Sequence, residues 1–201
     1  MARPGQGLPV IQINLHHSKT ATAILTKAIA EVPKIIALIQ EPWINNNVVN
    51  GLGSCGKLFH STSQDKIRTC IIIKGIHALF IPQVSTGDHT VIQARIPTEQ
   101  DQDIQVVIGS IYMPYDSDDL PPSTEVVNIL QFAKTRNMEL LLGCDANSHH
   151  TGWGSTNTNQ RGENLHNFIM TNELILFNRG SEPTFMDRRR QEFIDTIGTG
   201  T

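Results

Sequence analysis

Several apolar segments of this chain end in an acid, an amide or a phenol. Such side chains can bind a metal ion or donate hydrogen bonds to a phosphate. The residues concerned, each at the end of such a segment or inside the last one, are Asn14, Glu41, Tyr112, Asp145 with Asn147, and Asp195. In open α/β sheets, ligands bind beyond the carboxyl ends of the strands. We therefore expect these side chains to converge on one pocket.

The residue types define the chemistry of such a pocket. Glu41 and an aspartate such as Asp145 are hard oxygen donors, which suit Mg²⁺ or Mn²⁺. Asn14, Asn147 and Tyr112 can donate hydrogen bonds to a phosphoryl oxygen without adding negative charge. Phosphoester hydrolysis needs neutralised charge at phosphorus, an oriented water and a base, usually His or Asp. Each residue alone is typical of a cap, a turn or the core, and only the joint pattern favours catalysis.

Two pairs of adjacent histidines occur near these segments, His16 with His17 and His149 with His150. Neighbouring side chains of an extended chain point to opposite sides. We therefore expect that neither pair binds a single metal ion, and that these rings serve as backbone caps or groove walls.

Two other motifs have less chemical content. The segment "GLGSCG" (51–56) has the spacing of a dinucleotide-binding loop. It neither follows a strand nor opens a helix, so a flexible surface loop is the better prediction. The segment "DRRRQE" (187–192) is the densest basic cluster, and it fits either a solvated turn or a phosphate contact beside the site.

The periodicity of apolar residues predicts helices alternating with strands. A helix is expected between Ser18, its N-cap, and Pro33, with an apolar stripe that includes Ile24. Two more helices are expected at 121–137, with Ser123 or Thr124 as the cap and Val127 inside, and at 161–172. Strands are expected at 10–15, 34–40, 68–74, 77–82, 90–96, 104–114, 138–144, 174–178 and 192–197. This order predicts layered sheets covered by helices, with residues 1–9 as a flexible lead-in and 10–201 as a single domain.

Bulk composition excludes several classes of protein. A chain of 201 residues with 39% hydrophobic and 17% charged residues can bury a core as one domain. No apolar run reaches the roughly 20 residues of a membrane span, and the first residues lack the apolar core of a signal peptide. An odd count of 3 cysteines without a CxxC motif favours a reducing compartment. With a net charge of −3, the chain can bind a polyanion only through local contacts or a divalent metal.

The joint pattern resembles the endonuclease/exonuclease/phosphatase superfamily of the apurinic/apyrimidinic endonucleases, and within it the endonuclease domain of insect-type non-LTR retrotransposons. The resembling motifs follow the family's order over nearly the whole chain. They are "QINLHHSKTA", "LIQEPW", "GSIYMP", "LLLGCDANSHHTGWGS", "RGENL", "LFNRGSEPTF" and "FIDTI". The resemblance implies a four-layered α/β sandwich with two central mixed β-sheets flanked by helices.

The resemblance also implies roles for individual residues. Glu41 is similar to the family's metal-binding glutamate, and Asn14 to the amide near the metal and the phosphate. Tyr112 is similar to the tyrosine that contacts the phosphate. Asp145 is similar to the aspartate that orients or activates the attacking water, and Asn147 to its partner on the phosphate.

Further positions follow from the same resemblance. Asp195 is similar to the aspartate that holds the family's catalytic histidine, and Thr184 to a threonine on the DNA-facing side. Contacts with nucleic acid are also expected from His149 and from the arginines of the basic cluster, which are Arg188, Arg189 and Arg190.

One departure from the family is clear in the sequence. Members carry a Ser-Asp-His motif on a further strand after this aspartate, and these 201 residues contain no Ser-Asp-His. The histidines at 89, 149, 150 and 166 do not stand in the motif's place. We therefore expect the sandwich to lack its last strand and the chain to be weakly active or inactive.

Three hypotheses follow. The first is a Mg²⁺- or Mn²⁺-dependent endonuclease that nicks double-stranded target DNA for retrotransposon insertion, inside the cell and in the nucleus, with a reverse transcriptase domain in a longer parent chain and no membrane partner. The second is a non-catalytic DNA-binding remnant of such a domain. The third is a phosphatase or lipid phosphodiesterase of the same fold.

Overall fold

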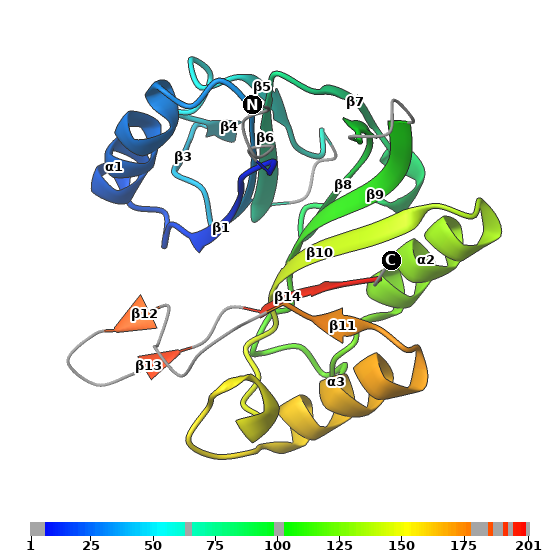
Figure 1. Ribbon diagram of the computed structural model, residues 1–201. Coiled ribbons are helices and arrows are strands. Elements are labelled where there is room, and N and C mark those ends of the chain that lie inside the picture. The colour runs from blue at the N-terminus through cyan, green and yellow to red at the C-terminus, as the bar shows by residue number, and fades with distance from the viewer. Residues whose placement is uncertain are drawn as a thin grey trace, which may run out of the picture.

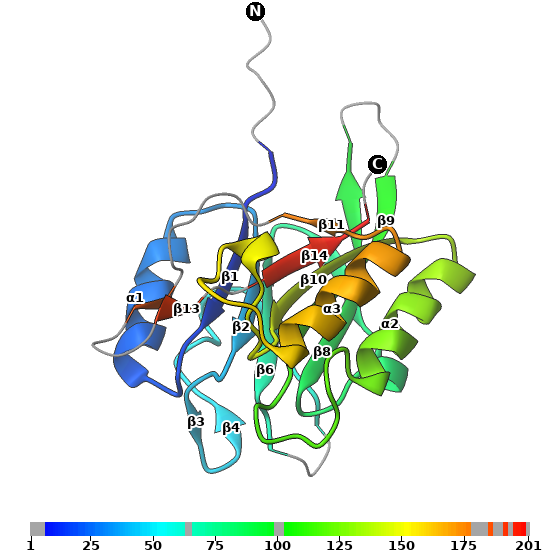
Figure 2. The same ribbon diagram turned by 90° about the horizontal axis from the view of Figure 1, so that it is seen from below.

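Two β-sheets packed face to face form the centre of the molecule, and helices cover both outer faces (Figures 1 and 2). The computed structural model describes residues 7–62, 66–98, 103–177, 185–186, 191–192 and 195–199. The mixed α/β architecture with two central mixed sheets, predicted above, is confirmed.

The first sheet has the strand order β1-β2-β6-β5. Its strands are β1 (Val10–Asn14), β2 (Ile35–Gln40), β6 (Thr69–Lys74) and β5 (Lys57–Phe59). The strands β1 and β2 are parallel and the other pairs antiparallel. A helix of 12 residues, α1 (Lys19–Ala30), connects β1 to β2, as a parallel pair requires.

The second sheet has the order β11-β14-β10-β9-β8-β7. Its strands are β7 (His77–Phe80), β8 (His89–Pro97), β9 (Asp103–Tyr112), β10 (Glu139–Asp145), β11 (Ile175–Leu176) and β14 (Asp195–Gly198). Only β9 and β10 are parallel among these pairs, and α2 (Thr124–Thr135) connects them. The remaining elements are α3 (Gln160–Thr171), two short helices η1 (Pro82–Val84) and η2 (Thr151–Trp153), and the pairs β3 (Ile44–Asn45) with β4 (Val48–Val49) and β12 (Phe185–Met186) with β13 (Gln191–Glu192). In the part of the chain described, no helix has the length and apolarity to cross a membrane.

Side-chain caps start all three long helices. The hydroxyls of Ser18 and Ser123, both predicted as possible caps, accept hydrogen bonds from backbone N–H groups in the first turn of α1 and α2. Asn159 does the same for α3. The sequence therefore predicted where helices begin.

The buried faces of two helices differ from the prediction. In α1, Ile24 is 67% exposed, whereas Thr22 and Leu25 are buried. In α2, Val127 is 43% exposed and Val126 is buried. Because one residue corresponds to about 100° of helix rotation, a small error in the chosen stripe exchanges inside and outside.

The segment "GLGSCG" (51–56) is not the flexible surface loop predicted from its composition. Leu52 is fully buried and Cys55 is 4% exposed, and both join the core between α1 and the first sheet. A Cβ atom on Gly56 would lie 2.6 Å from the carbonyl oxygen of Ile73. The glycine therefore permits a close backbone approach that leads into β5.

Polar contacts cross the space between the sheets. The side-chain amide of Gln12 donates to the carbonyl of Cys144 at 2.9 Å, and that of Gln40 donates to the carbonyl of Gly143 at 3.0 Å. A Cβ on Gly143 would lie 2.7 Å from a Leu38 methyl, so the glycine lets the sheets approach here. These contacts fix β1 and β2 against β10.

Replacing Ser110 tests this connection. Its hydroxyl accepts from the Gln40 amide at 2.9 Å and donates to the Ile39 carbonyl at 2.9 Å, in a fully buried position. We expect Ser110→Ala to lower the free energy of unfolding by about 1–3 kcal/mol, because it leaves buried polar groups without partners. Chemical denaturation measures this, with exposed Ser117→Ala as the control. Equal stability of both variants would contradict the prediction.

Candidate active site

The predicted site residues lie at one edge of the sandwich because the strand registers place them there. In the parallel pair β1–β2, Asn14 is opposite Gln40, the residue before Glu41. In the parallel pair β9–β10, Asp145 is opposite Tyr112. The carboxyl ends of four strands from two sheets therefore meet at this edge.

Asp145 is held from both sheets. Its Oδ2 accepts a hydrogen bond of 2.6 Å from the side-chain amide of Asn14, and its Oδ1 accepts one of 3.3 Å from the backbone N–H of Asn147. The other end of the Asn14 amide, Oδ1, accepts from the backbone N–H of His16 at 2.7 Å. The carboxylate thus has a fixed orientation and stays able to accept a further proton or hydrogen bond.

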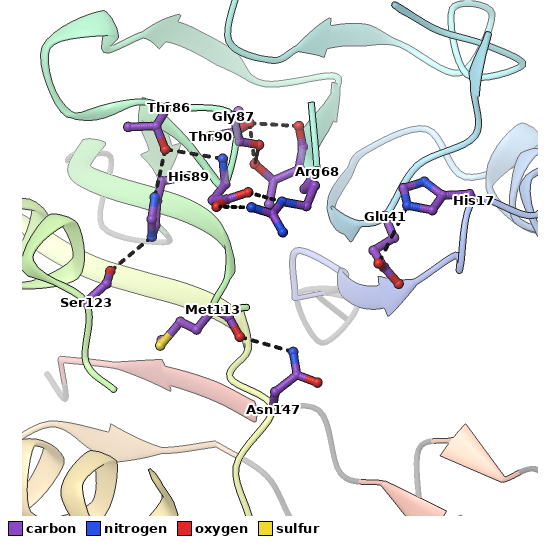
Figure 3. Close-up of polar contacts among 12 residues, drawn as sticks. His17, Glu41, Arg68, Thr86, Gly87, His89, Thr90, Met113, Ser123 and Asn147 are labelled. Atoms are coloured by element: carbon purple, nitrogen blue, oxygen red, sulfur yellow. Dashed lines mark hydrogen bonds and ion pairs between the residues drawn. The ribbon is translucent and has the colours of Figure 1, made fainter. Parts of the chain in front are cut away.

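Tyr112 and Asn147 form a second contact beside this carboxylate. Asn147 has a left-handed backbone (φ 47°), and its amide donates to the carbonyl of Met113 at 3.1 Å (Figure 3). Burial, followed by the negative charges of Glu41 and Asp145, raises the pKa of Tyr112, while its hydrogen bond with Asn147 acts in the opposite direction. The phenol therefore keeps its proton at neutral pH and can donate it.

Glu41 sits in a tight left-handed turn (φ 45°) at the end of β2. Its backbone N–H donates to the carbonyl of Arg68 at 2.7 Å, and its carbonyl accepts from the N–H of His17 at 2.8 Å. Its carboxylate oxygens lie 3.5 Å from Nδ1 of His16 and 3.6 Å from Nε2 of His17. The other ring nitrogen of His17 contacts the carbonyl of Pro42 at 2.9 Å.

The prediction that His16 and His17 point to opposite sides was wrong. It assumed an extended chain, but both residues have left-handed backbones (φ 47° and 54°), and this turn brings both rings to the carboxylate of Glu41. At the second pair the backbone-cap prediction holds for His150, whose Nδ1 accepts from the N–H of Gly152 at 2.9 Å.

The donor set fits a hard divalent ion with few protein ligands. Glu41 offers one carboxylate, and the amide oxygen of Asn14 lies at the same edge of the sandwich. Mg²⁺ typically uses one or two carboxylates and fills its other positions with water and phosphate. Among the described residues, no three His, Cys, Asp or Glu side chains are grouped as a closed metal site.

Several predicted site residues are described by the structure only in part or not at all. Thr184, Arg188, Arg189 and Arg190 lie outside the described residues. The backbone of Asp195 is in β14, opposite Cys144 and so one residue from Asp145 along the sheet. His149 is partly buried, and its Nδ1 contacts Oδ1 of Asn157 at 2.9 Å.

Arg161 is a site residue that the sequence reasoning did not identify. It is 8% exposed, and its guanidinium donates to the carbonyls of Asn147, Ala146 and Pro114 at 3.0–3.1 Å. A Cβ on the following Gly162 would lie 1.8 Å from a backbone oxygen of the same loop, so only glycine fits. The sequence signal was the motif "RGENL", which the sequence analysis gave as a family motif and as part of a helix, without a role for its arginine.

A pocket opens beside Tyr112, lined among others by Asp88, His89, Ser123 and Arg161. His89 is 4% exposed, and its ring contacts Oγ1 of Thr86 at 2.8 Å and Oγ of Ser123 at 3.2 Å (Figure 3). Burial lowers the pKa of His89 to about 4. This imidazole is therefore neutral at physiological pH and connects β8 to the start of α2.

Comparisons with known proteins agree with this geometry. A family model described as endonuclease-reverse transcriptase matches residues 106–201. The solved endonuclease domain of TRAS1, a telomere-specific non-LTR retrotransposon, is 26% identical, with a TM-score of 0.72 over 96% of this chain and 85% of that one. The chain has the endonuclease/exonuclease/phosphatase fold, and it is similar to the endonuclease domain of a non-LTR retrotransposon. The resemblance seen in the sequence is thus confirmed.

Structures with lower sequence identity share the same fold. The catalytic domain of Xenopus laevis APE2 is 12% identical, with a TM-score of 0.59 over 94% of this chain and 82% of that one. The human Nocturnin catalytic domain is 11% identical, with a TM-score of 0.51 over 88% and 73%. No curated protein sequence matches the chain.

The role of Arg161 can be tested through stability. Arg161→Gln removes charge-assisted hydrogen bonds to carbonyls that are buried under α3. We expect the free energy of unfolding to fall by about 3 kcal/mol, since each lost contact of this type costs roughly 1.5–3 kcal/mol. Arg136→Gln, on the exposed end of α2, should change it by less than about 0.5 kcal/mol. A loss no larger than that of the control would show that Arg161 does not support the site loop.

The buried His89 predicts a pH dependence of stability. Its pKa is about 4 in the folded chain and near 6.5 when unfolded, so the folded state binds fewer protons in this window. Its contribution to stability is therefore lost as the pH falls from 6.5 towards 4, by about 3 kcal/mol in total. We expect His89→Gln to lose less stability than wild type over this range in denaturation experiments. Parallel pH profiles would contradict the assignment.

Proposed function

We propose that this domain is a divalent-metal-dependent endonuclease that hydrolyses a phosphodiester bond of double-stranded DNA and so nicks the target of a retrotransposon. The observation that carries the proposal is the 2.6 Å contact between Asn14 and Asp145, which joins the metal side of the site to the water-orienting side across two sheets. The match to an endonuclease-reverse transcriptase family model supports it.

Glu41, with the amide oxygen of Asn14, would hold Mg²⁺ or Mn²⁺ at this edge. The ion would neutralise charge on the scissile phosphate and polarise it. The remaining steps belong to the chain's own side chains.

Asp145 is placed to orient the attacking water. N–H donors from the side chain of Asn14 and from the backbone of Asn147 fix the orientation of its carboxylate, which can accept a proton from water. Tyr112 keeps its proton because its pKa is raised, so its hydroxyl can donate to a phosphoryl oxygen as negative charge develops there. A carboxylate and a neutral donor on one rigid edge are what an in-line displacement by water requires.

The rate of this chain by itself should be low. The sequence contains no Ser-Asp-His motif, and loss of a general acid or base typically costs about 10²–10⁴-fold. His89 does not fit as a substitute, because it is buried and both of its ring nitrogens have hydroxyl partners.

The proposed substrate is duplex DNA, and the proposed compartment is the nucleus. The description of the family model supports a reverse transcriptase domain in a longer parent chain. A non-catalytic DNA-binding role is the second candidate, since these 201 residues contain no Ser-Asp-His. A phosphatase or lipid phosphodiesterase of the same fold is the third candidate, and the 26% identity to a retrotransposon endonuclease domain favours the endonuclease over it.

Nicking of supercoiled plasmid by the purified chain tests the proposal. We expect slow conversion to open circles with Mg²⁺ or Mn²⁺, none with EDTA, and a loss of about 10²-fold or more in Asp145→Asn, which keeps the shape but not the charge of the carboxylate. Asp103→Asn removes an exposed carboxylate at the opposite end of β9 and should nick like wild type.

The outcomes separate the candidates. Metal-dependent nicking that persists in Asp145→Asn would refute the assigned role of Asp145. Folded protein that binds duplex DNA without nicking it would indicate the non-catalytic role. Hydrolysis of a small phosphomonoester but not of DNA would indicate a phosphatase.

A further inference from the structure

An ion pair between Arg68 and Asp88 lies next to the site residues. Nε of Arg68 is 2.5 Å from Oδ1 of Asp88, and Nη2 is 2.8 Å from Oδ2, so the ion pair is bidentate (Figure 3). The side chains are 26% and 22% exposed. A bidentate contact of this kind fixes the orientation of the guanidinium as well as its distance from the carboxylate.

The backbones of the same two residues hold the two halves of the site. The carbonyl of Arg68 accepts the N–H of Glu41 at 2.7 Å, and the carbonyl of Asp88 accepts the N–H of Tyr112 at 2.9 Å. Arg68 precedes β6 in the first sheet, and Asp88 precedes β8 in the second. Their ion pair therefore bridges the sheets where the metal glutamate and the tyrosine are anchored.

The side chain of Arg68 also contacts Tyr112 directly. Its guanidinium carbon lies 5.1 Å from the centre of the tyrosine ring, a cation–π distance. On the other side, the Tyr112 hydroxyl bonds to Asn147. The phenol is thus held at its ring by Arg68 and at its tip by Asn147.

The turn that carries Asp88 is itself fixed. Thr86 Oγ1 accepts the backbone N–H of Asp88 at 3.2 Å and contacts the buried ring of His89. Arg68 N–H donates to the carbonyl of Gly87 at 2.8 Å (Figure 3). Asp88 therefore cannot follow Arg68 if the guanidinium moves, and the pair has one geometry.

We propose that Arg68 and Asp88 are positioning residues of the hydrolysis, whose ion pair sets the place of the Tyr112 hydroxyl. This inference rests on the proposed function. Arg68 does not serve as a phosphate contact here, because its Nε–H and Nη2–H groups donate to the carboxylate of Asp88, which also neutralises its charge. Its effect reaches the substrate through Tyr112.

The kinetic test uses conservative variants of the ion pair and a double-mutant cycle with Tyr112→Phe. Arg68→Lys keeps the charge but loses the bidentate contact with Asp88, and Asp88→Asn keeps the shape of the side chain but loses its charge. We expect either to lower kcat for nicking on the order of 10- to 100-fold with KM changed less than about 2-fold, since small misplacements have such effects. In a Tyr112→Phe background the same changes should cost less than about 3-fold, because the hydroxyl that they position is already absent.

The chain provides a matched control. Arg95 and Asp103 form an exposed pair, 3.7 Å apart, at the far ends of β8 and β9. Arg95→Lys and Asp103→Asn make the same chemical changes and should leave kcat unchanged. Full additivity of Arg68→Lys with Tyr112→Phe would overturn the positioning role. So would a loss expressed in KM with a changed salt dependence, which would identify Arg68 as a phosphate contact.

A second readout does not depend on catalysis. The chain has 2 tyrosines, Tyr112 and the 74% exposed Tyr115. With ¹³Cζ-tyrosine labelling, Arg68→Lys and Asp88→Asn should shift the Tyr112 signal and leave that of Tyr115 in place, with Tyr112→Phe giving the assignment. An unmoved Tyr112 signal in both folded variants would overturn the proposal. If wild type does not nick DNA, the proposed function fails, and this spectrum still decides whether the pair holds Tyr112.

Discussion

Amide side chains that cross the space between the two sheets are the contacts on which the site depends. Gln12, Asn14 and Gln40 all belong to the first sheet, and all donate to β10, at the backbone of Cys144, the carboxylate of Asp145 and the backbone of Gly143. Apolar packing alone would let the sheets slide past each other, but a slide here would leave the buried amide of Gln40 without its partner, at about 1–3 kcal/mol, and would break the half-buried contacts of Gln12 and Asn14. The Asn14–Asp145 contact is thus the outermost of a row whose inner members fix its geometry.

Tight left-handed turns then direct the side chains of the candidate site. Glu41, Asn147, His16 and His17 all have positive φ, which is uncommon for residues other than glycine and clusters at functional sites. Each turn follows a strand end and is held by backbone contacts, as Glu41 is by the carbonyl of Arg68 and the N–H of His17. The strands supply position and the turns supply direction, so the site needs both the sheets and the residues that brace the turns.

The sequence predicted features that depend on local pattern. Strand ends, the Ser18 and Ser123 caps and the side chains at the candidate site are encoded within a few residues, and the observed elements agree with them. It failed for Ile24 and Val127, because helix periodicity gives a face only to within one residue. It failed for the histidine turn at 16–17 because nothing local announced a left-handed backbone. Arg161 and the Arg68–Asp88 pair were missed because their partners are 14–48 and 20 residues away.

Charge explains why these arginines brace the site instead of binding the substrate. The chain carries a net charge of −3, and Glu41, Asp145 and Asp88 add negative charge at the edge where a polyanion would have to approach. In the described part of this edge, Arg68 is neutralised by Asp88, and Arg161 is directed at backbone carbonyls beneath the loop. Neither can offset a phosphate without releasing what it holds. In the proposed mechanism, a metal ion beside Glu41 would neutralise charge on the phosphate, so the proposed metal dependence and the scaffolding role of these two arginines fit one electrostatic arrangement.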